Sequence, residues 1–149
     1  MAFRDATASV AKGLVAGAAG TAAMTAFQMV EMKLTDRSAS TAPAQAVETV
    51  LDVEPTSEQA EQRLSNVTHW SYGTGWGAVR GLLGAVGVGN KGATGALFAL
   101  VWGSGLTMLP ALGIAPKPTE WGAKALAVDA TMHAVYAGTV SAVYEALDS

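Results

Sequence analysis

Uncharged, mostly apolar stretches alternate with polar connections along this chain. No side chain is charged between Lys12 and Glu31. As a helix, residues 13–30 would extend about 27 Å, close to the thickness of the hydrocarbon core of a bilayer. A second stretch, residues 92–110, also carries no charge and ends at a proline, which cannot continue a regular helix. Each stretch is long enough to cross a membrane once.

Two further stretches have the same length but contain ionisable side chains. Residues 67–88 include His69 and Arg80, and residues 126–147 include an acid and a second histidine. The pattern predicts an all-α integral membrane bundle in a single domain, residues 1–149. The predicted spans are about 13–31, 67–88, 92–110 and 126–147.

The polar connecting segment, residues 36–63, predicts a short amphipathic helix between the first and second spans. Ser40 or Thr41 can cap its start, Pro43 suits its first turn, and Glu54-Pro55 follows its end. Thr56 and Gln59 have the spacing of a capping box. They predict a second helix start that continues into residues 67–88.

A soluble helical bundle is the main alternative, because glycine and alanine dominate stretches where a spanning helix usually carries more leucine, isoleucine and phenylalanine. The chain has 17 glycines, and each inside a soluble helix costs up to about 1 kcal/mol relative to alanine. Membrane helices use small residues for close backbone contact. Three small-residue faces are predicted: Gly13 with Gly17; Gly73, Gly77 and Gly81; and Ala130, Ala134, Gly138 and Ala142.

The first stretch also resembles a secretory signal peptide between Ala2 and Ala26, with a basic start and small residues near a cleavage position. Its apolar run continues through Phe27, Met29 and Val30. That length favours a retained helix.

Composition narrows the functional classes. Only 14% of the residues are charged and the net charge is −3, without a basic run, so no nucleic-acid partner is expected. The chain has no cysteine, which excludes disulfides, thiolate metal sites and thiol nucleophiles. No phosphate loop, dinucleotide fingerprint or serine-histidine-acid order suggests an enzyme.

The polar residues of the spans fall on helix faces that could converge. His69 and Arg80 share the glycine face of the second span, Gln28 and Glu31 share a face of the first, and Asp129 aligns with His133 and Tyr136 in the fourth. A closed bundle would bring these faces together. The predicted intramembrane polar cluster is His69, Asp129, His133, Glu31, Gln28 and Arg80.

Asp129 and His133 are four residues apart, so the carboxylate can hydrogen-bond the imidazole and hold a proton on it. With His69, they also supply ligand types that zinc or iron accepts. No cofactor is predicted. A divalent metal on these three residues, or a haem between the two histidines, is the alternative.

Each polar residue also has a purely structural interpretation. Asp129 could be solvated at the interface, His133 could bond a backbone carbonyl, and Arg80 could extend toward the membrane surface near Lys91. Aromatic residues at the starts of the second and fourth spans predict interfacial anchors. These anchors are Trp70, Tyr72 and Trp121.

The run Asn66–Gly81, a third span ending in Leu109-Pro110, and the Asp129-x-x-x-His133 pattern resemble the YagU-like family of small bacterial inner-membrane proteins. The family has no assigned reaction, and one member is linked to acid resistance. By this resemblance His69, Asp129 and His133 are shared positions. Arg80 departs from the tyrosine or apolar residue expected before the glycine.

The resemblance implies a multi-pass protein of the bacterial cytoplasmic membrane. We expect its buried histidine and aspartate cluster to sense or conduct protons, or to support the envelope under acid stress. The lipid bilayer is its expected partner. Two alternatives are an accessory or assembly subunit of a larger membrane complex, with a second copy or other membrane subunits as partners, and a metal- or haem-binding membrane protein.

Overall fold

The computed structural model describes residues 3–149, and their side chains from residue 5 onward. Within this range the chain is helical and contains no strand. Four long helices and one short helix follow in the order α1 (Phe3–Thr35), α2 (Ala42–Leu51), α3 (Glu58–Ala85), α4 (Asn90–Ala111) and α5 (Ala123–Asp148). A turn of 3-10 helix, Pro118–Glu120, lies between α4 and α5. The predicted all-α fold is confirmed.

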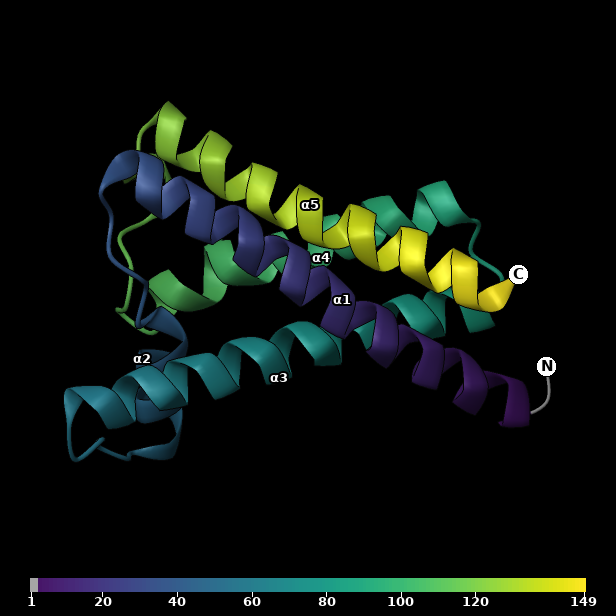
Figure 1. Cartoon of the computed structure of the whole chain (residues 1–149), viewed down its shortest axis with the longest axis horizontal. Helices are drawn as coiled ribbons and strands as arrows, with labels where there is room; N and C mark the ends of the chain where they lie inside the picture. Colours follow the sequence, from purple (N-terminus) through teal and green to yellow (C-terminus); the bar gives the residue numbers. More distant parts are fainter. Residues whose placement is uncertain (1–2) are drawn as a thin grey trace.

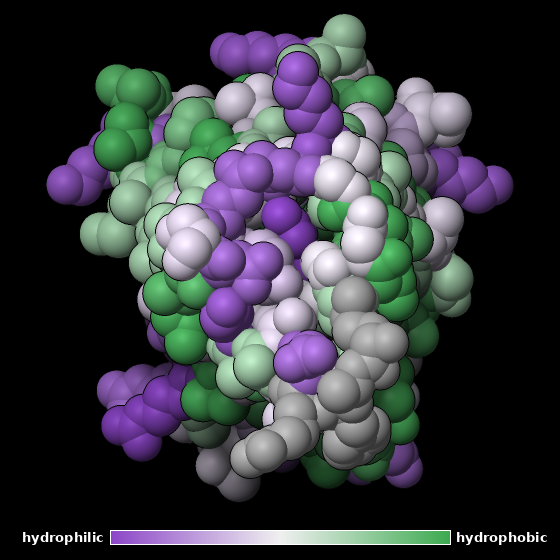
Figure 2. Space-filling view, turned by 90° about the vertical axis from the view of Figure 1, so that its right-hand side faces the viewer, coloured by the Kyte–Doolittle hydropathy of each residue, from purple (hydrophilic) through white to green (hydrophobic). Residues whose placement is uncertain are grey.

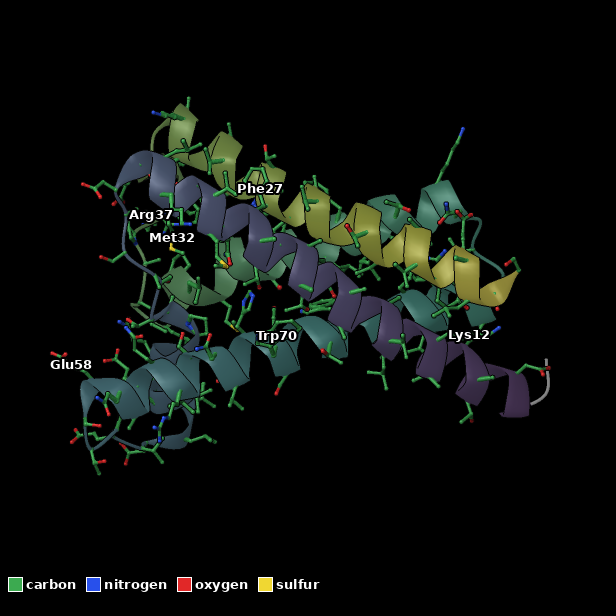
Figure 3. The ribbon with its side chains drawn as sticks, viewed as in Figure 1. Lys12, Phe27, Met32, Arg37, Glu58 and Trp70 are labelled. Carbon is green, nitrogen blue, oxygen red and sulfur yellow. The ribbon has the colours of Figure 1, made fainter. Side chains whose placement is uncertain are left out.

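The four predicted spans coincide with the four long helices, except that α3 ends at Ala85, before the predicted end of the second span. The long helices run alternately in opposite directions (Figure 1). The beginning of α1 and the end of α5 lie at one end of the bundle, and α2 lies against α3 at the other. Lys12 and Glu58 mark these opposite ends (Figure 3). Two helices, α1 and α4, are long and apolar enough to cross a membrane by length and composition. Helices α3 and α5 are outside that group.

Helix boundaries follow local chemistry. Pro43 lies in the first turn of α2, and the Ser40 hydroxyl accepts a hydrogen bond from the Ala42 amide at 3.2 Å. The α3 start differs from the prediction by one residue. Ser57, not Thr56, is the N-cap, and its hydroxyl accepts from the Ala60 amide at 3.2 Å. As predicted, α3 continues without a break into the second predicted span.

The closest packing in the bundle is between α1 and α3. A Cβ added at Gly17 would lie 2.6 Å from the Thr74 carbonyl oxygen, and one added at Gly77 would lie 2.6 Å from the Gly17 Cα. Gly13 and Gly81 face the opposite backbone in the same way. The two predicted glycine faces are therefore the contact surface, and any side chain there would separate the helices.

The third predicted small-residue face, on α5, does not contact another helix of the bundle that the structure describes. Ala134, Gly138 and Ala142 of α5 are exposed, and a Cβ added at Gly138 would meet nothing within 4 Å. The opposite side of α5 carries the large buried residues and packs against Gly20 of α1 and the apolar face of α4. The core consists of Ala16, Leu97, Val101, Tyr136, Ala137, Val140 and Tyr144.

Adding one methyl group at Gly77 should destabilise the fold, whereas the same change at Gly75 should not. Both glycines lie in α3, but a Cβ at Gly75 meets nothing within 4 Å. We expect Gly77→Ala to lower the free energy of unfolding by about 1–3 kcal/mol through overpacking. Gly75→Ala should raise it by up to about 1 kcal/mol through helix propensity. Unfolding followed by helical circular dichroism measures both, and equal effects would contradict the contact.

Candidate functional site

The two histidines lie in the half of the bundle toward the end of α1. His69 comes from α3 and is half-buried. Its Nε2 lies 3.2 Å from the Thr25 hydroxyl of α1, and that hydroxyl donates its proton to the Thr21 carbonyl at 2.8 Å. Since a threonine hydroxyl has one proton, it accepts from His69, and Nε2 of His69 carries a hydrogen. The second ring nitrogen, Nδ1, keeps its lone pair.

His133 of α5 has the opposite arrangement. Its Nδ1 lies 2.8 Å from the backbone carbonyl oxygen of Asp129, which can only accept, so Nδ1 carries the hydrogen. Nε2 of His133 therefore keeps its lone pair. The Asp129 carboxylate lies 3.7 Å from the same Nδ1. Its Oδ2 accepts a hydrogen bond from the Trp102 indole of α4 at 2.8 Å.

The imidazoles of His69 and His133 are close enough for their charges to interact. Three long helices thus contribute to one polar site, and a fourth reaches it through the Trp102 indole. We call this set, Thr25, His69, Trp102, Asp129 and His133, the histidine site. It contains three of the residues that the sequence pattern selected.

The remaining residues of the predicted cluster lie elsewhere. Glu31 forms an ion pair with Arg37 at 2.7 Å at the end of α1, where Figure 3 shows Arg37. Gln28 is partly buried one turn before Glu31. Arg80 is eleven residues beyond His69 in α3, which places it about 16 Å further along the helix axis.

Arg80 belongs to the other end of the bundle. Only 2% of the residue is exposed. Its guanidinium donates to the Ser141 hydroxyl at 3.3 Å and to the Asn90 side-chain oxygen at 2.9 Å, and lies 4.1 Å from the centroid of the Tyr144 ring. The side chain does point toward the end where Lys91 lies, but it is covered by α4 and α5.

Two tyrosines connect helices near the histidine site. Tyr136 of α5 donates to the Gly73 carbonyl of α3 at 2.5 Å, beside the glycine contact with α1. Tyr72 of α3 donates to Ser104 of α4 at 2.7 Å, because the serine hydroxyl is itself bonded to the Val101 carbonyl. These bonds fix the position of α3 against its two neighbours.

The predicted interfacial aromatics lie on the surface or in a loop. Trp70 and Tyr72 are 40% and 41% exposed on α3, and Figure 3 shows Trp70 in the half of α3 nearer Glu58. The Trp121 indole donates to the Pro116 carbonyl at 2.8 Å in the connection before α5. Their membrane role stays a prediction.

Among the described residues, no three histidine, cysteine or acidic side chains are placed to hold a metal ion. The predicted set of His69, Asp129 and His133 is not such a group, and the Asp129 carboxylate is bonded to the Trp102 indole.

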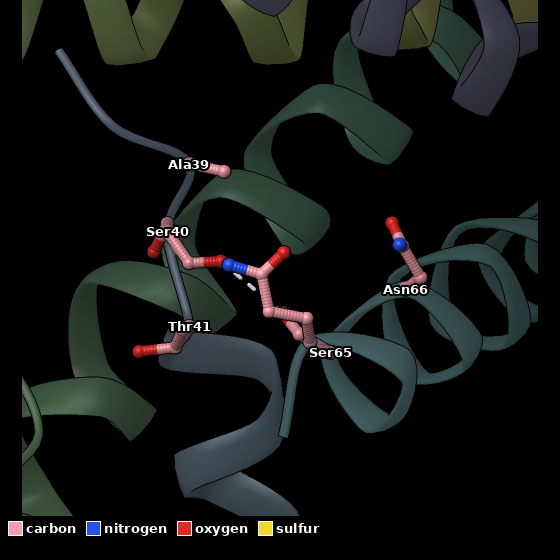
Figure 4. A pocket seen from close by; sticks show the side chains of 6 residues that line it. Ala39, Ser40, Thr41, Ser65 and Asn66 are labelled. Atoms are coloured by element: carbon pink, nitrogen blue, oxygen red, sulfur yellow. Dashed lines mark hydrogen bonds between the residues drawn. The ribbon is translucent and has the colours of Figure 1, made fainter. Parts of the chain in front are cut away.

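A small cavity of about 40 Å³ lies where the loop before α2 crosses α3 (Figure 4). Its wall includes Ser40, Thr41 and Asn66, and Ser65 donates to the Ser40 carbonyl across it at 3.1 Å. The cavity has room for about one water and contains no charged side chain. The bond from Ser65 holds the connecting segment against α3.

The chain matches no protein-family model, no curated protein and no solved structure. The resemblance to the YagU-like family therefore stays an expectation. The function has to be argued from the geometry of the histidine site.

The sequence pattern missed two members of the histidine site. Thr25 lies one turn after Thr21 on the polar face of α1, so the helical spacing contained a signal for it. Trp102 had none, since its bond to Asp129 depends on how α4 packs against α5. The stack of Trp102 on Phe98, with ring centroids 5.2 Å apart, holds the indole in place.

Replacing Tyr136 by phenylalanine should weaken the bundle more than the same change at Tyr72. Tyr136 is buried and bonds a backbone carbonyl, whereas Tyr72 is exposed and its partner Ser104 keeps another bond. We expect Tyr136→Phe to lower the free energy of unfolding by about 1 kcal/mol and Tyr72→Phe by about 0.5 kcal/mol or less. Chemical unfolding of both variants gives the comparison, and a larger loss at Tyr72 would refute it.

Proposed function

We propose that the protein is an integral protein of the bacterial cytoplasmic membrane that crosses the bilayer four times and responds to acid by taking up a proton at the histidine site. The proposal has two parts, membrane insertion and proton uptake. Each rests on a different set of observations.

Membrane insertion is supported by the outer surface. Helices α1 and α4 satisfy the length and composition expected of spans. All four long helices expose large apolar side chains, which lipid tails would cover at no cost. They include Leu14, Val15, Met29, Val30, Val67, Leu82, Leu100, Met108 and Leu147.

The ionisable residues of α3 and α5 do not oppose this arrangement. Arg80 is buried, and the side chains of Asp129 and His133 are only 31% and 16% exposed. Intramembrane ionisable groups normally face the interior of a bundle and bond one another. The ionisable residues that α3 and α5 turn toward the interior are therefore compatible with spanning.

Proton uptake is supported by one observation above all, the opposite hydrogen bonding of the two imidazoles. In its neutral form each ring carries its hydrogen on the bonded nitrogen, and the other nitrogen is free to accept a proton. A proton on either ring opposes a second, since their charges interact. Histidine is the side chain that ordinarily gains a proton under mild acid, so a proton taken up within the bundle would enter this site.

A proton on His133 has a specific consequence. The imidazolium would attract the Asp129 carboxylate, which lies 3.7 Å away and is bonded to Trp102 of α4. A stronger contact between His133 and Asp129 would change the hydrogen bond from Trp102, because both contacts use Oδ2 of Asp129. Acid would thereby alter the link between α4 and α5, and this geometry favours a sensor.

Conduction is less well supported. The two cavities described here lie at the ends of the bundle, and neither is lined by a histidine. The histidine site is enclosed by helices that pack through glycine backbones. A sensor needs proton access only to the site, whereas a conductor needs a wetted path through it.

Tryptophan fluorescence between about pH 7.5 and pH 5 tests this function. We expect the wild type, inserted in lipid vesicles, to show a transition within this pH range that arises from the indole bonded to Asp129. His133→Gln should abolish the transition, and Trp102→Phe should remove the signal while preserving the fold. The chain has two histidines, so the double variant His69→Gln/His133→Gln also removes all ordinary titration in this range.

His69→Gln alone serves as the matched comparison, because it keeps the partner of Asp129. The transition should persist in that variant with a shifted midpoint. A transition of unchanged size and midpoint in His133→Gln would overturn the function. Bacteria that carry His133→Gln in place of the wild type should also survive acid less well, and equal survival would contradict the acid response.

A further inference from the structure

A larger cavity, of about 450 Å³, opens at the end of the bundle opposite the histidine site. It lies where α3 turns into α4 and where α5 ends. Figure 2 looks onto this end, and hydrophilic residues gather around its middle while apolar residues cover its sides. The side chains that matter for binding are Arg80, Asn90, Tyr144, Glu145 and Asp148.

The floor of the cavity is positively charged and has unused hydrogen-bond donors. Arg80 is buried, and its Nη1 has no hydrogen-bond partner among the residues that the structure describes. Tyr144 is only 2% exposed, and its hydroxyl also has no hydrogen-bond partner among the described residues. A buried guanidinium with an unsatisfied donor is costly, and an oxyanion satisfies both its charge and its hydrogen bond.

Glycine makes room for this floor. A Cβ at Gly84 would lie 2.8 Å from Cζ of Tyr144, so a side chain there would displace the ring that covers the guanidinium. Ser141 and Asn90 hold the other two nitrogens of Arg80 at 3.3 and 2.9 Å. Arg80 is thus positioned by α4 and α5, and its Nη1 is left without a hydrogen-bond partner among the described residues.

The rim of the cavity is negatively charged. Glu145 and Asp148 line it and are exposed. Asp148 is already paired with Lys12 at 2.8 Å, and neither acid is within 4.0 Å of Arg80 among the described residues. A simple anion would be repelled by Glu145, and a simple cation by Arg80.

We propose that this cavity binds a zwitterionic aminoalkyl phosphate of the phosphoethanolamine type. The phosphate reaches the Arg80 and Tyr144 donors at the floor, since its several oxygens can accept from separate donors. The ammonium stays at the rim beside Glu145. Two sources share this chemistry, the headgroup of phosphatidylethanolamine and soluble phosphoethanolamine.

The lipid is the source that the position favours. The cavity lies at a bundle end, beside the exposed apolar residues Leu82, Val86 and Leu147, where acyl chains could continue from a bound headgroup. Only this choice of source rests on the proposed membrane insertion. The binding chemistry of the cavity does not depend on it.

The first experiment uses the full chain in vesicles of equimolar phosphatidylethanolamine and phosphatidylglycerol, followed by gentle extraction and native mass spectrometry. We expect the retained lipid to be enriched in phosphatidylethanolamine. Arg80→Gln should lower retention about tenfold, the loss of one charged hydrogen bond. Glu145→Gln, at an exposed position that leaves the fold intact, should reduce the preference for phosphatidylethanolamine over phosphatidylglycerol.

Lys91→Gln is the matched control, because it removes an exposed positive charge at the same end without touching the cavity wall. It should leave both retention and preference unchanged. Equal retention of the two lipids by the wild type, or an unchanged preference in Glu145→Gln, would overturn the assignment.

A second experiment distinguishes the lipid headgroup from soluble phosphoethanolamine as the ligand. It also tests ligand binding separately from membrane insertion. Calorimetric titration of the detergent-extracted protein with soluble phosphoethanolamine and with inorganic phosphate measures the cavity without a bilayer. Binding of phosphoethanolamine, with no lipid retained, assigns the soluble source. Tighter binding of inorganic phosphate, or no binding in either arm, overturns the proposal. Vesicle flotation tests membrane insertion independently, so failure to float would refute the proposed function and the choice of the lipid as the source, but not the binding chemistry of the cavity.

Discussion

The close contact of the α1 and α3 backbones is the constraint on which the other features depend. Gly13, Gly17, Gly77 and Gly81 bring the two backbones into direct contact at the crossing, and Gly73 makes room for the Thr21 side chain of α1. The crossing sets where Thr25 of α1 meets His69 of α3. It also places the Gly73 carbonyl within reach of Tyr136 of α5. The geometry of the histidine site is therefore set by the packing of α1, α3 and α5. The sequence of each helix supplies only the polar side chains.

The ionisable groups are separated between the two ends of this bundle. The neutral, tautomer-fixed imidazoles lie toward one end, and the buried guanidinium lies toward the other. Because a charge in a low-dielectric interior interacts strongly with its neighbours, keeping Arg80 away from the histidines leaves them free to gain a proton. The arginine is stabilised instead by Ser141, Asn90 and the face of Tyr144.

Helical spacing in the sequence predicted the features that are determined within a single helix. The four long helices, the two glycine faces and the alignment of Asp129 with His133 all follow from helical periodicity. Helical spacing did not predict the features that depend on how a second helix packs against the first. The alanine and glycine face of α5 points outward because its opposite face carries larger apolar residues that bury more area. Arg80 shares a face with His69 but is too far along the axis to meet it, and the Trp102 bond required the placement of α4.

The central claim is that the two imidazoles are held as opposite neutral tautomers. Nitrogen-15 magnetic resonance of the histidine rings, in protein inserted in lipid bilayers near neutral pH, reads the tautomers directly. We predict hydrogen on Nε2 of His69 and on Nδ1 of His133, and, on mild acidification, one ring becoming charged before the other. Two rings in the same tautomer, or both gaining protons together as independent groups, would contradict the account.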